Sequence, residues 1–291
     1  MSTTATTRTT TRSTIHDRSV TPARDARRRR LLEGTAFVVV WMALGYAFPG
    51  NDLVYLLMGV PLTVGFQVLV RQRPLRELWV RDSTRFTLDR RGLVLASLLV
   101  VAPIYYGAKA LPGANAWLIG WYAAAIIGAA GAAFALRATT AAAMLRAAMV
   151  PMAVGAGGMA AVLGGIHLAA NTPVHVLAVL GTVAKYLLLY FPLTFLIEEV
   201  AFRGALDAHV HHAGEGRPWH SALFVSALWG LWHLPISGGL PLPLLVLELL
   251  AVHCLIGVPL SFAWRRTRNL VGPAFAHSAI DAVRNALVLG L

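Results

Sequence analysis

The sequence predicts an all-α protein, a polytopic transmembrane helix bundle with about eight or nine spans. Hydrophobic residues make up 57% of the 291-residue chain and charged residues only 13%, whereas soluble domains are about a quarter charged. The apolar residues gather in runs, and arginines cluster between those runs. This placement is typical of topology control and of attraction to anionic lipid, so the net charge of +12 does not predict a nucleic-acid partner.

The chain begins with a polar segment, residues 1–30, that is rich in threonine and arginine and has few large apolar side chains. Such a segment cannot bury a core, so we predict a disordered basic tail. It ends in four arginines, Arg27 to Arg30, directly before apolar sequence. The long polar lead is unlike a cleaved signal peptide, and we expect the tail to anchor the first span on the cytoplasmic side.

The rest of the chain alternates between apolar runs and short polar connectors. Gly50-Asn51 and Pro112-Gly113 are turn signals between runs. The many glycines and alanines in residues 147–170 favour close packing against other helices. The predicted helical runs are residues 32–48, 53–70, 93–111, 116–136, 147–170, 174–196, 219–234, 242–264 and 271–291.

The connectors support one orientation in the membrane. Counting crossings from a cytoplasmic N-terminus places the arginine-rich connectors on the cytoplasmic side, as the positive-inside rule requires. These connectors are residues 71–92, 137–146, 207–218 and 265–270. We divide the chain into N-terminal transmembrane helices, residues 31–173, and candidate catalytic helices, residues 174–291.

The sixth apolar run ends in the stretch Glu198-Glu199-Val200-Ala201-Phe202-Arg203. A charged group near the bilayer centre costs about 3 kcal/mol on insertion scales, so such groups pair, line a wet cavity or do chemistry. On a helix, Glu199 and Arg203 share a face and can pair, whereas Glu198 points about 100° away. One carboxylate is then neutralised, and Glu198 is left as a proton acceptor or a metal ligand.

Two later groups share this mixture of polar residues in apolar sequence. His233 ends the run Trp229-Gly230-Leu231-Trp232-His233, and His277 lies four residues before Asp281, on the same face of a helix. Each group alone is explained by an interfacial side chain or a helix contact. Together with Glu198 they supply carboxylates and imidazoles from three helices, which suffices for hydrolysis.

The residues leave two chemistries open. Water held between Glu198 and His233 could be deprotonated by Glu198 as general base, while His277 donates to the oxyanion that forms at a carbonyl. Glu198, His233 and His277 could instead hold one divalent metal ion, such as zinc, with a position open for water.

The three groups resemble the motifs of the CPBP intramembrane proteases, which comprise the type II CAAX prenyl endopeptidases and their bacterial Abi relatives. Glu198-Glu199-x-x-x-Arg203 looks like the first family motif. Trp229-x-x-x-His233 is similar to the second, Phe-x-x-x-His, with tryptophan in place of phenylalanine. His277-x-x-x-Asp281 is similar to the third, His-x-x-x-Asn, with aspartate in place of asparagine. The resemblance covers residues 175–285, and the order of the motifs is that of the family.

The resemblance implies an all-helical bundle that cleaves peptide bonds of a peptide or protein substrate near the lipid surface, such as the last residues after a prenylated cysteine. It implies that Glu198 and His233 activate water, that Glu199 with Arg203 shapes the site, and that His277 and the residue at 281 bind the oxyanion or a metal. Trp229 is expected to fill the same space as the aromatic side chain of the family's phenylalanine. With the composition, the resemblance predicts an integral protein of a bacterial plasma membrane.

The aspartate at position 281 changes the chemistry at that point. Asparagine offers an N–H to an oxyanion, whereas an ionised aspartate only accepts hydrogen bonds. Asp281 must therefore be protonated, orient His277 or ligate a metal, and Arg284, three residues later, could pair with it. The alternative to an endopeptidase is a non-catalytic membrane scaffold or a bacteriocin-immunity-type factor that binds a partner through the same cavity.

Overall fold

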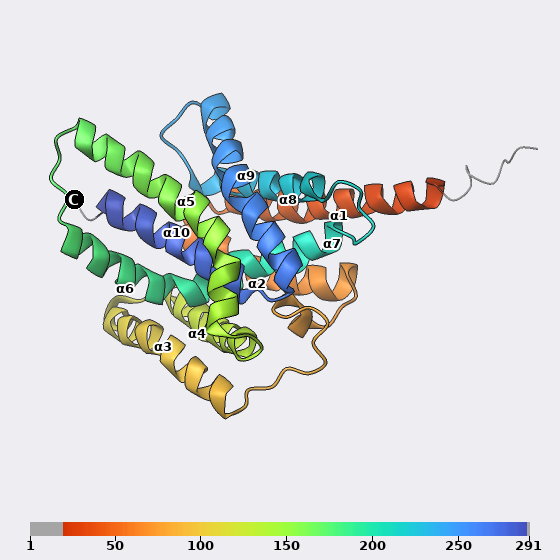
Figure 1. Ribbon diagram of the computed structural model, residues 1–291, viewed down its shortest axis with the longest axis horizontal. Helices are drawn as coiled ribbons and strands as arrows, with labels where there is room; N and C mark the ends of the chain where they lie inside the picture. The colour runs from red at the N-terminus through yellow and green to blue at the C-terminus, as the bar shows by residue number, and fades with distance from the viewer. Residues whose placement is uncertain (1–19, 290–291) are drawn as a thin grey trace, which may run out of the picture.

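The computed structural model, which describes residues 20–289, shows a bundle built from helices alone over that range (Figure 1). The first half contains α1 (Val20–Ala47), α2 (Asp52–Gly65), α3 (Arg90–Ala110), α4 (Ala116–Arg137) and α5 (Ala141–Ala169). The second half contains α6 (Val176–Thr194), α7 (Ala208–Val210), α8 (Pro218–Trp232), α9 (Leu242–Thr267) and α10 (Val271–Leu289). Short segments of tighter or wider helix join them: η1 (Phe66–Val70), η2 (Leu75–Leu78), η3 (Leu111–Gly113), η4 (Phe195–Asp207) and η5 (Leu234–Ile236).

The predicted membrane bundle is confirmed. Within residues 20–289, 7 helices are long and apolar enough to cross a membrane. The remaining long helices are α8 and α10, which have 15 and 19 residues. At 1.5 Å per residue, α8 reaches about 22 Å, less than the hydrocarbon thickness of about 30 Å. The number of full crossings is therefore between seven and nine.

Helix starts follow local capping. Asn51, Asp89, Asn115 and Thr140 each accept a hydrogen bond from the backbone N–H three residues later, at the starts of α2, α3, α4 and α5. Such caps satisfy N–H groups that have no partner within the helix. Thr140 therefore starts α5 at Ala141, earlier than the predicted residue 147.

The predicted disordered tail is wrong over its last part. Helix α1 begins at Val20, so residues 20–30 are helical rather than disordered, and residues 1–19 lie outside the described range. Arginine and alanine are good helix formers, and Arg29 pairs with Glu33 one turn later at 2.7 Å. These local contacts, which a composition argument ignores, favour extending the first span into a basic helix.

The N-terminal helices share one core with the helices of the site. Trp41 of α1 donates to the carbonyl of Tyr55 at 2.8 Å and stacks on Phe202 of η4. The Tyr55 hydroxyl donates to the carbonyl of Trp232 at the end of α8, at 2.5 Å. This aromatic cluster joins α1 and α2 to η4 and α8.

A glycine lets η2 pack directly beneath the η4 motif. The α-carbon of Gly204 faces the backbone carbonyl of Leu78, where any β-carbon would overlap that oxygen. The small residue after Arg203 is therefore required by backbone contact rather than by flexibility.

Candidate active site

The predicted motif lies on a π-helical segment, η4, which continues directly from α6. Sequence periodicity indicated an ordinary helix here. π-Helical segments are uncommon and occur frequently at functional sites. Along η4, Glu198 is partly exposed while its neighbour Glu199 is fully buried. The two adjacent carboxylates therefore have different environments, as the sequence predicted.

Glu199, Arg203 and His277 form a buried chain of contacts. Arg203 Nη1 donates to Glu199 Oε1 at 2.7 Å, and both side chains are 0% exposed. His277 Nδ1 contacts the same Glu199 oxygen at 2.8 Å. The predicted pairing of Glu199 with Arg203 is confirmed, and the pair also orients the imidazole of His277 on α10.

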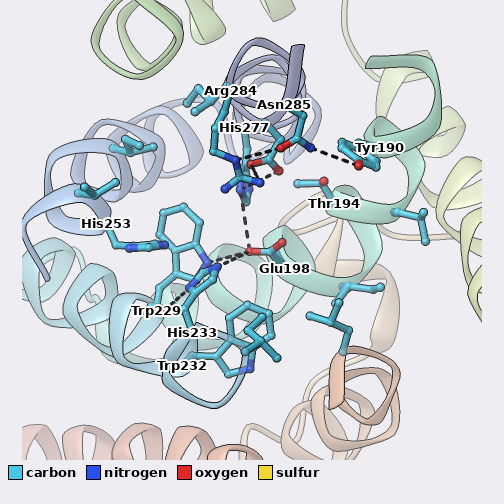
Figure 2. A pocket seen from close by; sticks show the side chains of 18 of the residues that line it. Tyr190, Thr194, Glu198, Trp229, Trp232, His233, His253, His277, Arg284 and Asn285 are labelled. Atoms are coloured by element: carbon cyan, nitrogen blue, oxygen red, sulfur yellow. Dashed lines mark hydrogen bonds and ion pairs between the residues drawn. The ribbon is translucent and has the colours of Figure 1, made fainter. Parts of the chain in front are cut away.

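Glu198 stands at the centre of the candidate site (Figure 2). Its Oε2 accepts a hydrogen bond from Trp229 Nε1 at 2.9 Å. The same oxygen lies 3.9 Å from His233 Nε2 and 3.9 Å from His277 Nε2. Both distances are too long for direct hydrogen bonds, but a water that contacts both partners at about 2.8 Å fits beside either pair.

The hydrogen-bond partner of Nδ1 fixes the tautomer of a neutral His233. Its Nδ1 contacts the backbone carbonyl of Trp229 at 2.9 Å. A carbonyl only accepts hydrogen bonds, so Nδ1 carries the hydrogen, and in a neutral ring Nε2 keeps its lone pair. His233 therefore presents an acceptor toward Glu198, where it can orient a water.

Trp229 has a larger role than the predicted aromatic filler. Its indole N–H is the group that contacts Glu198, and a phenylalanine at this position has no such donor. The Arg203 guanidinium also lies over its ring, 4.2 Å from the ring centre. Trp229 thus contacts both the free carboxylate and the buried ion pair.

Asp281 lies beside His277 and Arg284 on α10. Its Oδ2 is 3.6 Å from His277 Nε2, and its Oδ1 is 3.4 Å from Arg284 Nη2. The expected pairing with Arg284 is thus present as a long contact at the cavity. Asp281 approaches the nitrogen of His277 that faces the site, whereas Glu199 holds the opposite nitrogen.

The metal ligands that the structure gathers differ from the predicted set. Glu198, His277 and Asp281 bring one ligand atom each within 4.8 Å of one another. Asp281, one of whose predicted roles was metal ligation, joins this group instead of His233, because its side chain shares a face of α10 with His277. Two carboxylates and one imidazole suit zinc, and Glu199 supplies the carboxylate that commonly holds a metal-bound histidine. The residues present therefore fit a divalent metal.

A cavity of about 390 Å³ opens in front of these side chains. Its lining combines the charged groups with aromatic and apolar residues from several helices. Sequence reasoning missed five of its polar residues: Tyr190, Thr194, Ser237, His253 and Asn285. Asn285 donates to the Tyr190 hydroxyl at 3.2 Å (Figure 2). His253 interrupts an apolar run on α9, a signal that could have identified it, and its ring centre lies 4.2 Å from that of His233.

Comparison with known proteins agrees with this geometry. Residues 180–283 match the family model described as type II CAAX prenyl endopeptidase Rce1-like. The match confirms the resemblance drawn from the motifs, and the matched segment contains all six predicted site residues. The chain matches no curated protein and no solved structure.

Proposed function

We propose that this chain, whose residues 180–283 match the prenyl endopeptidase family, is an intramembrane endopeptidase in which Glu198 and His233 activate water. One observation carries the proposal. Glu198 Oε2 is 3.9 Å from Nε2 of two imidazoles and faces a cavity, while the adjacent Glu199 is neutralised by Arg203.

Glu198 acts as the general base. A water beside Glu198 and His233 Nε2 loses its proton to Glu198 as its oxygen attacks the peptide carbonyl. His233 Nε2 accepts the second hydrogen of that water and so fixes its orientation. Glu198 then gives the proton to the departing amine, and the carbon–nitrogen bond breaks.

His277 supplies the donor for the oxyanion. The charged groups around His277 comprise three carboxylates, Glu198, Glu199 and Asp281, against two arginines, the buried Arg203 and the exposed Arg284. An imidazolium at His277 balances these charges, and Glu199 and Asp281 flank its two nitrogens. A proton on Nε2 can then be donated to the oxygen that becomes negative in the tetrahedral intermediate.

The same residues support a metal-assisted variant of this reaction. A divalent ion held by Glu198, His277 and Asp281 would act as a Lewis acid for the carbonyl and would lower the pKa of bound water. In that variant Nε2 of His277 would carry no hydrogen, and Glu199, itself paired with Arg203, would hold the ring at Nδ1.

The substrate is a peptide or protein segment at the membrane. The cavity falls in the volume range of pockets that enclose small ligands, about 300–1,000 Å³, so it accommodates a few residues rather than a folded domain. The family description favours the C-terminal end of a lipid-modified protein. The lining, which mixes aromatic, apolar and charged residues, suits an apolar peptide whose scissile carbonyl must reach polar groups.

The test is peptide cleavage by purified protein in detergent. Substrates are a prenylated C-terminal peptide and a set of membrane-anchored peptides. We expect Glu198→Gln to lose about 10²–10⁴-fold in kcat, the usual contribution of a general base. Glu248→Gln is the matched control, because Glu248 is an exposed carboxylate on α9 that does not line the cavity. Equal cleavage by wild type and Glu198→Gln, or none by folded wild type on any peptide, contradicts the proposal and favours a scaffold.

A further inference from the structure

The two ends of the bundle differ in their basic residues. Connectors at one end, with the adjacent helix ends, carry most of the arginines: residues 71–91, 137–146, 217 and 265–268. Connectors at the other end contain neither lysine nor arginine: residues 48–51, 111–115, 170–175 and 237–241. Lys109, in the last turn of α3, is the cation beside them. In Figure 1, α1 begins at the right of the view and α10 ends at the left, so the two ends are separated along the bundle.

The arginine-rich end is closed by buried polar contacts. Arg265 at the end of α9 binds Asp207 through Nε at 2.9 Å and Pro218 O through Nη1 at 2.6 Å. Asn269 donates to the carbonyl of Ala135 at 2.8 Å, and Leu270 N donates to the carbonyl of Trp79 at 3.0 Å. These contacts join the ends of η4, α4, α8, α9 and α10, together with the segment that follows η2.

The interior between this end and Glu198 is also filled. Phe202, Arg203, Ser226, Ser261 and Ala274 are all 0% exposed. On η4, Glu198 is the last residue to line the cavity. The cavity therefore ends before it reaches this buried layer. Substrate therefore has no path to Glu198 from the arginine-rich end in the described chain.

The cavity extends toward the opposite end. At 1.5 Å per residue, its lining residue Met159 lies about 27 Å along α5 from Ala141, and Arg284 lies about 20 Å along α10 from Val271. Ser237, in the connector between η5 and α9, also lines it. Arg284, which pairs with Asp281 at 3.4 Å, has a side chain that is 48% exposed. Water or headgroups are required at this rim because a guanidinium exposed to hydrocarbon is costly.

We infer that substrate reaches Glu198 from the membrane face opposite the arginine-rich end. By the positive-inside rule that face is the non-cytoplasmic one. The substrate class rests on the proposed function. It comprises peptide segments that emerge on the non-cytoplasmic side, within or beside the outer leaflet, rather than proteins delivered from the cytoplasm.

The test begins with thiol labelling, which does not require activity. In a Cys254→Ala background, which removes the single native cysteine, one cysteine is placed at the cavity rim by Ser237→Cys. Thr84→Cys marks the arginine-rich face and Thr172→Cys marks the opposite face, since both threonines are exposed in connectors. Each variant is treated with a membrane-impermeant maleimide in sealed right-side-out vesicles and again after permeabilisation.

We expect Ser237→Cys and Thr172→Cys to react in sealed vesicles, and Thr84→Cys only after permeabilisation. The inference is overturned if Ser237→Cys, like Thr84→Cys, reacts only after permeabilisation. It is also overturned if Ser237→Cys reacts in neither condition. Cleavage of an impermeant peptide by right-side-out but not inverted vesicles would support the substrate class, and the reverse would contradict it. Absence of cleavage from both sides, with the expected labelling, counts against the endopeptidase and leaves the sidedness intact.

Discussion

Two buried arginine–carboxylate pairs have their carboxylates on η4 yet are built differently. Asp207 and Arg265 form a closed clamp: the guanidinium also binds Pro218 O and Ser221 Oγ, at 2.6 and 3.0 Å. Glu199 and Arg203 form an open pair, in which Glu199 Oε2, Arg203 Nε and Arg203 Nη2 have no protein partner. The Asp207–Arg265 pair makes its hydrogen bonds to other helices of the bundle. The Glu199–Arg203 pair keeps donors and an acceptor without partners, beside Glu198 and His277.

We interpret the first pair as structural and the second as part of the proposed site. Buried charge is retained at a cost that satisfied hydrogen bonds offset. At the arginine-rich end the satisfied clamp fixes where η4, α8 and α9 meet. Around Glu199 the incomplete satisfaction is stable because the imidazole of His277 and the ring of Trp229 add two further contacts. We therefore expect mutations in the clamp to change stability and mutations in the open pair to change activity.

The clamp gives the largest expected effect. Asp207→Asn leaves the Arg265 guanidinium buried without its counter-charge, and we expect a loss of about 3–5 kcal/mol in unfolding free energy. Asp82→Asn is the matched control, because Asp82 pairs with Arg268 at 2.8 Å while 61% exposed, where a pair contributes about 0–1 kcal/mol. Denaturant unfolding in detergent compares the two variants. Equal destabilisation by both would remove the distinction between the clamp and a surface pair.

The open pair gives the next effect, on activity. Glu199→Gln keeps the shape of the side chain but removes the charge that orients His277 and balances Arg203. We expect kcat to fall about 100-fold, equivalent to about 2.7 kcal/mol, with folded protein recovered in normal yield. A variant that is fully active but poorly folded would place Glu199 in the scaffold instead.

The next variant removes the hydrogen bond from Trp229 to Glu198, which the phenylalanine of the family motif cannot make. Trp229→Phe keeps an aromatic ring but removes the N–H that donates to Glu198. A hydrogen bond to a charged group contributes about 1.5–3 kcal/mol, so we expect kcat to fall about 10-fold with KM unchanged. Trp264→Phe is a control from the same residue type, since the Trp264 N–H has no partner and does not line the cavity. A KM effect without a kcat effect would assign Trp229 to substrate binding.

The smallest effect concerns the loop between α7 and α8. Burial opposes ionisation of Glu215, but hydrogen bonds from Ser221 and His211 hold its pKa below the ordinary value of 4.5. Its contribution to stability is therefore complete above about pH 4.5 and is lost as pH falls through the lower folded-state pKa. We expect the wild-type melting temperature to drop more steeply than that of Glu215→Gln on acidification below pH 4.5. Parallel curves would show that Glu215 does not contribute.

Much of this site could be predicted from the sequence, because charge within apolar runs is rare enough to mark function. Glu199 with Arg203 follows from helical spacing, and the convergence of Glu198, His233 and His277 follows from the motif resemblance. The indole contact of Trp229 could not be predicted, because it depends on how α8 packs against η4. The π-helical form of η4 was not indicated by the residue spacing either. Asp281 was among the metal ligands that the sequence left open, but its grouping with Glu198 and His277 in place of His233 depends on how α10 packs.

The fold was predicted to the level of helices but not of their ends. The apolar runs identify every long helix, since the bilayer imposes a length on them. Caps such as Thr140 and pairs such as Arg29 with Glu33 move the starts of α5 and α1 beyond the apolar sequence. The division into residues 31–173 and 174–291 remains a prediction, and the Trp41–Tyr55–Trp232 contacts show that the two segments share a core.

The central claim is that Glu198 activates water for attack on a peptide bond. The most direct measurement is cleavage of a membrane-anchored peptide in ¹⁸O-labelled water, with mass spectrometry of the new C-terminus, for wild type and Glu198→Gln. The account predicts one ¹⁸O atom in each newly formed carboxylate and a loss of product in the variant. A product without ¹⁸O, or equal product from both proteins, would contradict it.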